Sequence, residues 1–247
     1  MRFWVLRYFV GATALFAAGL TQSLAQDLAQ GSANGPVVVE LFTSQACSSC
    51  RAADAYFSEL ASRDDVIAIS WHVDYWNKLE TRHGRWRDPY SDPQCTKRQR
   101  QYNKNLRGRS SVYTPQIVIN GLAEAVGSDR EDVGALINAA RASQPVAAIS
   151  ARRDGDEMVF EIGATEAGGE AFLATLKPVV NTEIHHGENA GMVIQEINVV
   201  TGLQSLGEVA SEGGRLTADA PQAGDHCAIL VHESDQGRII AAAYCPS

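Results

Sequence analysis

The most restrictive feature of this sequence is an apolar segment of strand length that runs directly into two closely spaced cysteines. Val37 to Phe42 is rich in β-branched residues, which is typical of a buried strand. Thr43 to Ala46 is expected to form a turn, and apolar residues then recur at helical spacing from Ala52 to Leu60. The pattern therefore predicts a strand, a tight turn and a helix that opens with Cys47-Ser48-Ser49-Cys50.

The position of the two cysteines indicates their chemistry. The start of a helix presents unpaired amide groups and positive potential, which favour a thiolate on Cys47. Two intervening residues allow Cys50 to attack a mixed disulfide that Cys47 has formed. We therefore expect thiol–disulfide exchange, with Cys47 as the accessible attacking thiolate and Cys50 as the resolving thiol.

Other interpretations of the cysteine pair stay open. The pair could be an inert structural disulfide, a copper-binding or delivery site completed by a histidine, or part of a non-catalytic binding module. A zinc site would need two further ligands, and the sequence holds no second Cys-x-x-Cys.

Strands and helices alternate from the cysteine pair to Pro145. The expected elements are a strand at Val66–Val73, a loop at residues 74–92, a polar helix at Pro93–Leu106, a strand at Val112–Asn120, a hairpin turn at Asn120-Gly121, a returning strand at Leu122–Val126 and a helix that Ser128 or Asp129 caps and that ends near Ala142. Pro115 lies at the head of an apolar strand, where a proline is unusual unless the strand is an edge or the bond is cis. Thr114, just before it, could offer its backbone to an extended substrate.

These motifs together resemble the thioredoxin superfamily: a strand, a Cys-x-x-Cys helix, and a Thr-Pro before a hairpin. The resemblance implies that Pro115 is cis and packs beside Cys47, and that Thr114 and Pro115 form the substrate platform. The chain also resembles, over about residues 36–245, a bacterial secreted family of unassigned function. That second resemblance rests on residues 39–45, the cysteine pair, Ala53-Asp54, residues 71–76, residues 112–121, residues 187–191 and residues 198–200. The chain departs from this family at Arg51-Ala52, where prolines usually follow the second cysteine.

A different pattern begins after Pro145. Short apolar runs separated by Gly, Asp and Glu predict strands at residues 146–149, 158–162, 172–176, 179–184, 192–200, 206–209, 227–232 and 239–244. The charge changes at the same place, because residues 26–145 hold 14 basic and 14 acidic side chains, whereas residues 146–247 hold 5 and 15. We therefore expect an α/β thioredoxin-like domain at residues 36–145 followed by an all-β sandwich-like domain at residues 146–247. The acidic half makes nucleic acid a poor partner.

The N-terminal residues have the composition of a secretory signal. Arg2 and Arg7 accompany an apolar run that ends at Leu20, and Ser23-Leu24-Ala25 offers small residues to a signal peptidase. We expect a signal peptide at residues 1–25, a tether at residues 26–35, and a periplasmic or secreted mature protein that does not contact a membrane; an uncleaved anchor is the alternative. Expected partners are exported protein thiols or disulfides, small thiols, and an unidentified reducing or oxidising partner. No cofactor or metal is implied.

Several other side chains are candidates for supporting roles. Asp54 shares a helix face with Cys50 and could either transfer protons or serve as an acid that a helix start favours. His72 could also transfer protons, although a hydrogen-bonded structural histidine is commoner. Cys95 is a candidate for an unpaired thiol, because the five cysteines cannot all pair. Residues 94–109 carry six basic side chains and no acid, so this segment is either a solvated helix face or a dock for an acidic partner. A weak candidate metal site comprises His185, His186 and His226.

Cys227 and Cys245 are expected to form a structural disulfide. Strands at residues 226–234 and 238–245 flank the three-residue loop Asp235-Gln236-Gly237, in which Gly237 is expected to take the left-handed conformation. In that register the numbers of paired positions sum to 472, so Cys227 faces Cys245 and their β-carbons come within reach of a disulfide. Two buried reduced thiols are the alternative.

Overall fold

The computed structural model describes residue 1, residues 35–142 and residues 147–246. The expected signal peptide and tether therefore lie outside the described residues, apart from Met1 and Gly35. The expected domain boundary at residues 145 and 146 lies outside them as well.

In the N-terminal half, the described residues 35–142 contain four strands and three α-helices. They are β1 (Val37–Thr43), α1 (Arg51–Ala61), β2 (Val66–His72), α2 (Pro93–Arg107), β3 (Gln116–Ile119), β4 (Ala123–Val126) and α3 (Arg130–Ala142). Short 3-10 helices at Ser48–Cys50 and Tyr75–Lys78 precede α1 and follow β2. Strand β1 pairs in parallel with β2 and antiparallel with β3, and β3 forms a hairpin with β4 through Asn120-Gly121, both at positive φ.

In the C-terminal half, residues 147–246 contain seven strands. They are β5 (Ile149–Asp154), β6 (Glu157–Ile162), β7 (Gly169–Glu183), β8 (Val193–Val209), β9 (Gly214–Asp219), β10 (His226–His232) and β11 (Ile239–Tyr244). The runs predicted separately at 172–176 and 179–184 join in the single long strand β7, and those at 192–200 and 206–209 join in β8. The pairing of β7 with β8 continues through two register shifts, after Ala171 and after Thr175. Strand β9 was not predicted, because only Leu216 and Ala218 are apolar in it.

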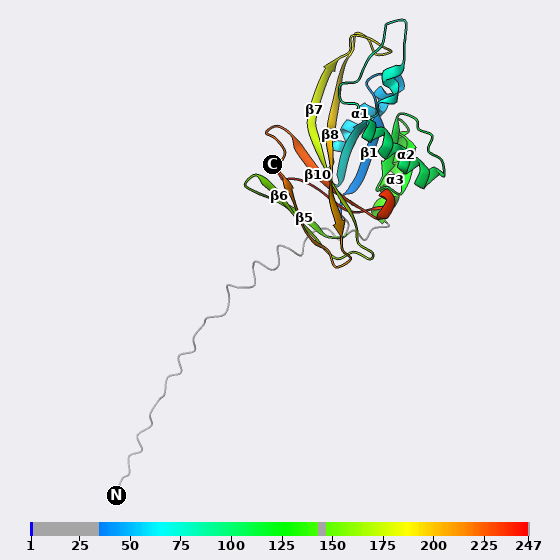
Figure 1. Ribbon diagram of the computed structural model, residues 1–247. Coiled ribbons are helices and arrows are strands. Elements are labelled where there is room, and N and C mark those ends of the chain that lie inside the picture. The colour runs from blue at the N-terminus through cyan, green and yellow to red at the C-terminus, as the bar shows by residue number, and fades with distance from the viewer. Residues whose placement is uncertain (2–34, 143–146, 247) are drawn as a thin grey trace. The chain divides into compact units, whose positions relative to one another are not determined.

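The two halves share one large sheet, so the expected division into two separate domains is wrong. Eight strands pair in the order β11-β10-β7-β8-β2-β1-β3-β4, and β5, β6 and β9 form a second sheet (Figure 1). The halves join where β2 pairs in parallel with β8 at Ser70 and Val199. Without β8, the buried strand β2 would have an open edge of unpaired backbone groups, which explains why the sheet continues across the boundary. The described residues from 35 onward accordingly belong to one compact unit.

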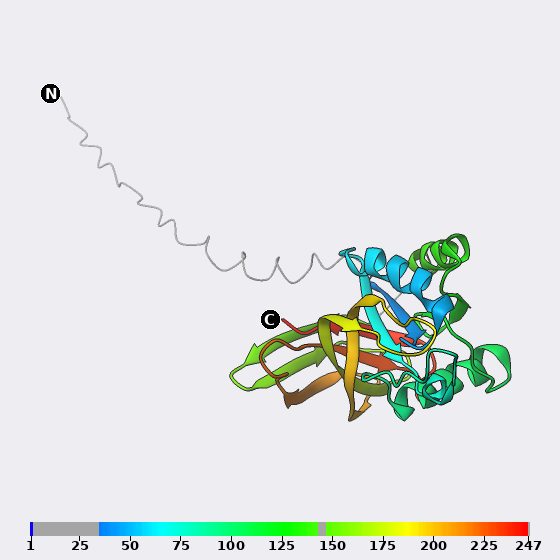
Figure 2. The same cartoon turned by 90° about the horizontal axis from the view of Figure 1, so that it is seen from above.

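Helices cover both faces of the sheet in the N-terminal half, which explains the continuous apolar run in β1. Val39 and Leu41 belong to one apolar cluster with Phe57 of α1 and Ile137 of α3. Val38 and Phe42 belong to a second cluster with Tyr102 of α2. Figure 2 shows α2 on the opposite side of the sheet from α1 and α3. A third apolar cluster lies between the two sheets of the C-terminal half and includes Phe160 and Ile229.

A buried ion pair ties the two halves together on the α2 side of the sheet. Arg98 of α2 donates to Glu40 of β1 at 2.6 and 3.0 Å, and its guanidinium also contacts the Nε2 of His232 of β10 at 2.8 Å. Tyr102 donates to the same Glu40 carboxylate. Because Arg98 and Glu40 are both almost fully buried, each charge depends on the other for its compensation.

The hairpin of β10 and β11 joins Cys227 and Cys245 by a disulfide. Ala228 pairs with Tyr244, as the expected register requires, but a bulge follows Val231 and shifts the pairing by one residue near the turn. The expectation for Gly237 was wrong, because its φ is −71°. Asp235 and Gln236 instead take the left-handed conformation, at φ 59° and 54°.

Within the described residues, no helix combines the length and apolar character that a membrane crossing requires.

Candidate functional site

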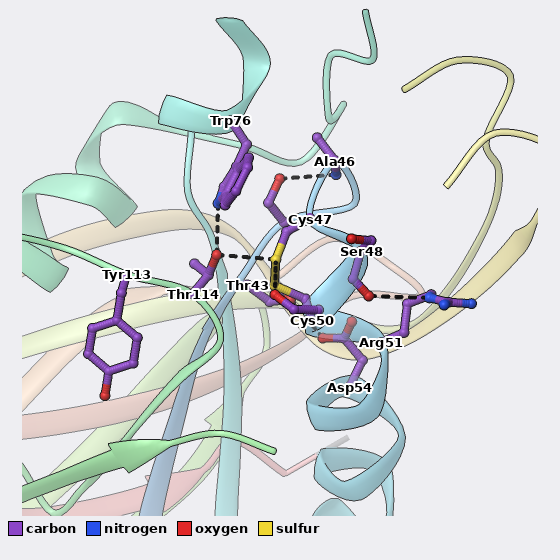
Figure 3. Close-up of a disulfide and its surroundings, with 12 residues drawn as sticks. Thr43, Ala46, Cys47, Ser48, Cys50, Arg51, Asp54, Trp76, Tyr113 and Thr114 are labelled. Carbon is purple, nitrogen blue, oxygen red and sulfur yellow. Dashed lines mark hydrogen bonds between the residues drawn. A yellow bond between two sulfur atoms is a disulfide. The ribbon is translucent and has the colours of Figure 1, made fainter. Parts of the chain in front are cut away.

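Two segments that are distant in sequence meet at the Cys47–Cys50 pair. Strand β1 is followed by a turn in which the Cys47 amide donates to the Ser44 carbonyl at 3.0 Å. Helix α1 then begins at Arg51. Cys47 and Cys50 are joined by a disulfide at this helix start (Figure 3). The Thr114–Pro115 peptide bond is cis and lies next to it. All four of these residues were predicted to belong to the candidate site.

Polar side chains contact the sulfur of Cys47 from two directions. The hydroxyl of Thr114 donates to the Cys47 sulfur at 3.3 Å, and the Ser49 hydroxyl lies 3.3 Å from the same atom. Trp76 donates its indole N–H to the Thr114 hydroxyl at 2.7 Å (Figure 3). The Thr114 hydroxyl therefore accepts from Trp76 and donates its own proton to the sulfur. A hydroxyl donor of this kind would stabilise a thiolate on Cys47.

The expectation that Cys47 is accessible is not met in this oxidised form. Cys47 is 1% exposed and Cys50 is fully buried, while Ser48 and Ser49 are exposed. Besides Thr114, the loop at residues 184–192 between β7 and β8 covers the backbone of the motif. Asn189 of this β7–β8 loop donates to the carbonyls of Gln45 and Cys47 at 2.8 and 3.3 Å. No local pattern in residues 37–60 indicates this cover, because it comes from the other half of the chain.

Asp54 lies one turn after Cys50, on the buried side of α1 (Figure 3). The Thr43 hydroxyl donates to its carboxylate at 2.8 Å. Burial raises the pKa of Asp54 to about 7, the negative charge of Glu196 adds to this rise, and the Thr43 hydrogen bond partly offsets it. The carboxyl can therefore gain or lose a proton near neutral pH, which suits an acid–base role beside a thiol.

His72 belongs to the same buried group of charges. Its Nδ1 lies 2.8 Å from Asp88, and its Nε2 lies 3.4 Å from Glu196 of β8. Burial alone would lower the pKa of His72, but the charges of Asp88 and Glu196 outweigh it and raise the pKa to about 9. His72 is thus a protonated partner of two carboxylates, rather than the neutral base that an acid–base role near pH 7 would require.

Three residues that hold this cluster together, Gln45, Asp88 and Glu196, were not predicted from the sequence. Gln45 donates its side-chain amide to Glu196 at 2.7 Å and its backbone amide to Asp88 at 2.9 Å. Gln45 also accepts from Trp86 at 3.2 Å. An acid at a buried strand position was the one available signal, since Glu196 lies two residues after the buried Ile194, on the same face of β8. Asp88 lies in a loop, and nothing local distinguishes it from a solvated acid.

The remaining candidates lie away from the disulfide. Cys95 is a buried free thiol, and burial raises its pKa to about 12. The basic segment divides, because Arg98 is buried in its ion pair while Lys97, Arg100 and Lys104 of α2 are exposed. Within the described residues, no group of three or more His, Cys, Asp and Glu side chains is arranged to hold a metal ion.

Arg51 forms no hydrogen bond to the sulfur atoms of Cys47 or Cys50 within the described residues. Its side chain is exposed, donating to the Ser48 carbonyl at 3.3 Å and contacting the Met192 sulfur at 3.1 Å. It thus lies across the outer end of the motif, against the C-terminal end of the β7–β8 loop.

Solved structures with a similar fold include two from bacteria. A crystal structure of a protein from Agrobacterium tumefaciens, a Northeast Structural Genomics Consortium target, is 27% identical, with a TM-score of 0.74 over 86% of this chain and 94% of that chain. HBP35 of Porphyromonas gingivalis is 14% identical, with a TM-score of 0.56 over 87% of this chain and 76% of that chain. At that identity the second likeness concerns the fold alone.

No curated protein matches the chain. The family model of DUF1223, described as a protein of unknown function, matches residues 38–232. This range includes the disulfide, the cis Thr114–Pro115 bond and the acids that surround His72. The chain therefore belongs to the DUF1223 family.

Proposed function

We propose that this protein is an exported thiol–disulfide oxidoreductase of thioredoxin-like type. The main support is one juxtaposition: a Cys-x-x-Cys disulfide at a helix start, with the Thr114 hydroxyl on the Cys47 sulfur at 3.3 Å beside a cis proline. The arrangement of β2, β1, β3 and β4 with helices on both faces also supports a thioredoxin-like assignment. The apolar N-terminal segment and the Cys227–Cys245 disulfide fit an oxidising compartment outside the cytosol.

The reaction of the oxidised form begins with a substrate thiolate. The thiolate attacks the Cys47 sulfur, a new sulfur–sulfur bond forms, and the Cys47–Cys50 bond breaks with its electron pair on Cys50. Protonated Asp54, one turn from Cys50, supplies the proton that neutralises the leaving thiolate. A second substrate thiolate attacks the substrate sulfur of the mixed disulfide, so that a substrate disulfide and a Cys47 thiolate are released. Overall, two substrate thiols are oxidised and one protein disulfide is reduced.

The reverse direction uses the same groups. A Cys47 thiolate attacks a substrate disulfide, and the first substrate thiolate leaves. Cys50 then loses its proton to ionised Asp54 and attacks the Cys47 sulfur, so that the Cys47–Cys50 bond forms, the bond to the substrate sulfur breaks and the second substrate thiolate leaves. A pKa of about 7 for Asp54 allows both directions, because both protonation states are populated at neutral pH.

Trapping of mixed disulfides tests the proposed roles of the two cysteines. Cys50→Ser should hold a stable mixed disulfide with glutathione at Cys47, because no resolving thiol remains. Cys47→Ser should form far less adduct, because the Thr114 hydroxyl donates to the sulfur of Cys47 and would stabilise its thiolate, and this sulfur is lost in the variant. Both variants are made in a Cys95→Ser background and read by peptide mass mapping. Equal adduct formation in both variants, or none in either, would contradict the proposal.

A further inference from the structure

The β7–β8 loop contributes a charged side chain directly to the start of the cysteine helix. The carboxylate of Glu188 accepts a hydrogen bond from the Ser48 backbone amide at 3.0 Å. Ser48 follows Cys47 immediately, and its amide is one of the unpaired donors that a helix start presents. The C-terminal half of the chain therefore occupies a donor that would otherwise favour negative charge on Cys47.

The loop is fixed in this position by contacts on two sides. Asn189, which is 2% exposed, binds the carbonyls of Gln45 and Cys47. The amide of Gly187 donates to the His83 carbonyl at 3.2 Å. Gly187 has φ +80°, and a β-carbon there would lie 2.9 Å from that of Trp86, so a glycine is required for this close approach. Glu188 lies between these two residues, so their contacts hold its backbone in place.

Among the described residues, charged groups near the cysteine motif come from both the β7–β8 loop and α1. Glu188 lies on the β7–β8 loop at the Ser48 amide, and Arg51 of α1 spans the Ser48 carbonyl and Met192. Asp54 of α1 lies on the buried side and is half-ionised near neutral pH. Arg51 favours a thiolate on Cys47 and Glu188 opposes it, so the loop counteracts the helix start and the arginine.

We propose that Glu188 is a positioning residue that sets the reactivity of the cysteine pair by disfavouring the Cys47 thiolate. This inference rests on the proposed function, since it concerns the redox equilibrium of the same disulfide. Reduction adds two electrons and two protons to the disulfide, and the reduced form is further stabilised when Cys47 ionises. A negative charge beside Cys47 opposes that ionisation. Glu188 therefore lowers the reduction potential of the couple and reduces the fraction of attacking thiolate at neutral pH.

Replacement of the charge should have an effect of moderate size. Because Glu188 is exposed, solvent screens its charge, and its repulsion of a thiolate on Cys47 is expected to correspond to about three- to tenfold in an equilibrium constant. Glu188→Gln should therefore increase the thiolate–thiol ratio of Cys47 by about three- to tenfold. Where Cys47 is ionised, the same factor applies to the equilibrium with glutathione, which is about 15–30 mV in reduction potential. Glutamine retains an oxygen that can accept from the Ser48 amide, so the loop contact is preserved.

The experiment uses the full chain and three variants. Glu188→Gln removes the charge, Glu188→Lys reverses it, and Glu183→Gln makes the same charge change at an exposed position of β7. The Cys47 alkylation rate of the reduced protein is measured with iodoacetamide from pH 5 to 10 and assigned by peptide mapping. The redox equilibrium with glutathione is measured at pH 8.

The expected result is a graded series. The Cys47 titration moves to lower pH and the potential rises from wild type to Glu188→Gln to Glu188→Lys, while Glu183→Gln matches wild type. If wild type exchanges with glutathione but Glu188→Gln and Glu188→Lys behave like Glu183→Gln, the role of Glu188 is refuted and the proposed function stands. If wild type does not exchange at all, the proposed function itself fails.

Discussion

Replacing Asp54 with asparagine tests the buried acid beside the cysteine pair through the stability of the fold. In the native protein the pKa of Asp54 is about 7, compared with an ordinary value of 3.8. One pKa unit corresponds to about 1.36 kcal/mol, so the ionised carboxylate costs the native state roughly 4 kcal/mol above pH 7. Asparagine is neutral at every pH, and its amide oxygen can still accept from Thr43. The variant should therefore be more stable than wild type wherever Asp54 is ionised.

The sign of the pH dependence follows from proton binding. Between about pH 4 and pH 7 the native state holds the Asp54 proton more tightly than the unfolded state does. The contribution of this group is therefore fully favourable below pH 4 and is lost as the pH rises through 7. We expect Asp54→Asn to exceed wild type by about 4 kcal/mol at pH 8 and by only about 1 kcal/mol at pH 4.5.

Urea denaturation of the oxidised protein, followed by tryptophan fluorescence, measures this difference. Asp64→Asn is the matched control, because it makes the same chemical change at an exposed position and should alter stability little. A difference between Asp54→Asn and wild type that is equal at pH 4.5 and pH 8 would refute the reasoning. So would a variant that is less stable than wild type at pH 8.

The same variant tests the acid–base role kinetically. If Asp54 exchanges a proton with Cys50, Asp54→Asn should slow the resolution of a glutathione mixed disulfide at pH 7 by about 100-fold. A variant that gains stability at pH 8 yet resolves the mixed disulfide at the wild-type rate would limit Asp54 to an electrostatic role. Stopped-flow reaction of the reduced protein with oxidised glutathione gives this rate.

Two further predictions concern the C-terminal half and its attachment. Replacing Cys227 and Cys245 with serine should destabilise the protein by about 3 kcal/mol, because the disulfide closes a loop with a sequence separation of 18. Denaturation under non-reducing conditions measures this loss. An unchanged midpoint would contradict the prediction. Arg98→Met should cost about 3–5 kcal/mol by leaving the Glu40 carboxylate buried without compensation, and the double variant with Glu40→Gln should recover part of that loss in the same assay. A double variant less stable than Arg98→Met would show that the uncompensated Glu40 charge is not the main cause of the loss.

Local patterns were sufficient where a feature depends on neighbouring residues. The Cys47–Cys50 pair could be placed at a helix start because an apolar strand and a helical period flank it directly. The pairing of Cys227 with Cys245 followed from the length of one hairpin. Even there, the turn differs in detail, because left-handed residues at Asp235 and Gln236 replace the expected glycine, and a bulge restores the register.

Features that join distant segments could not be predicted in this way. The pairing of Ser70 with Val199 joins the halves across more than a hundred residues, and no periodicity in either strand indicates its partner. His72, Asp88 and Glu196 come from three separate segments, so their mutual charges become visible only in the fold. The change in charge at residue 146 suggested two domains, yet charge reflects surface composition and does not report which strands pair.

Selective reduction of the two disulfides tests the central claim most directly. The oxidised full-length protein is equilibrated with glutathione redox buffers, quenched with acid, alkylated and mapped by peptide mass. We predict that Cys47–Cys50 is reduced reversibly within the range of these buffers while Cys227–Cys245 stays intact, because a catalytic disulfide has a higher reduction potential than a structural one. A Cys47–Cys50 disulfide that resists reduction as long as Cys227–Cys245 does, in the native protein at pH 7, would contradict the assignment of thiol–disulfide exchange to this site.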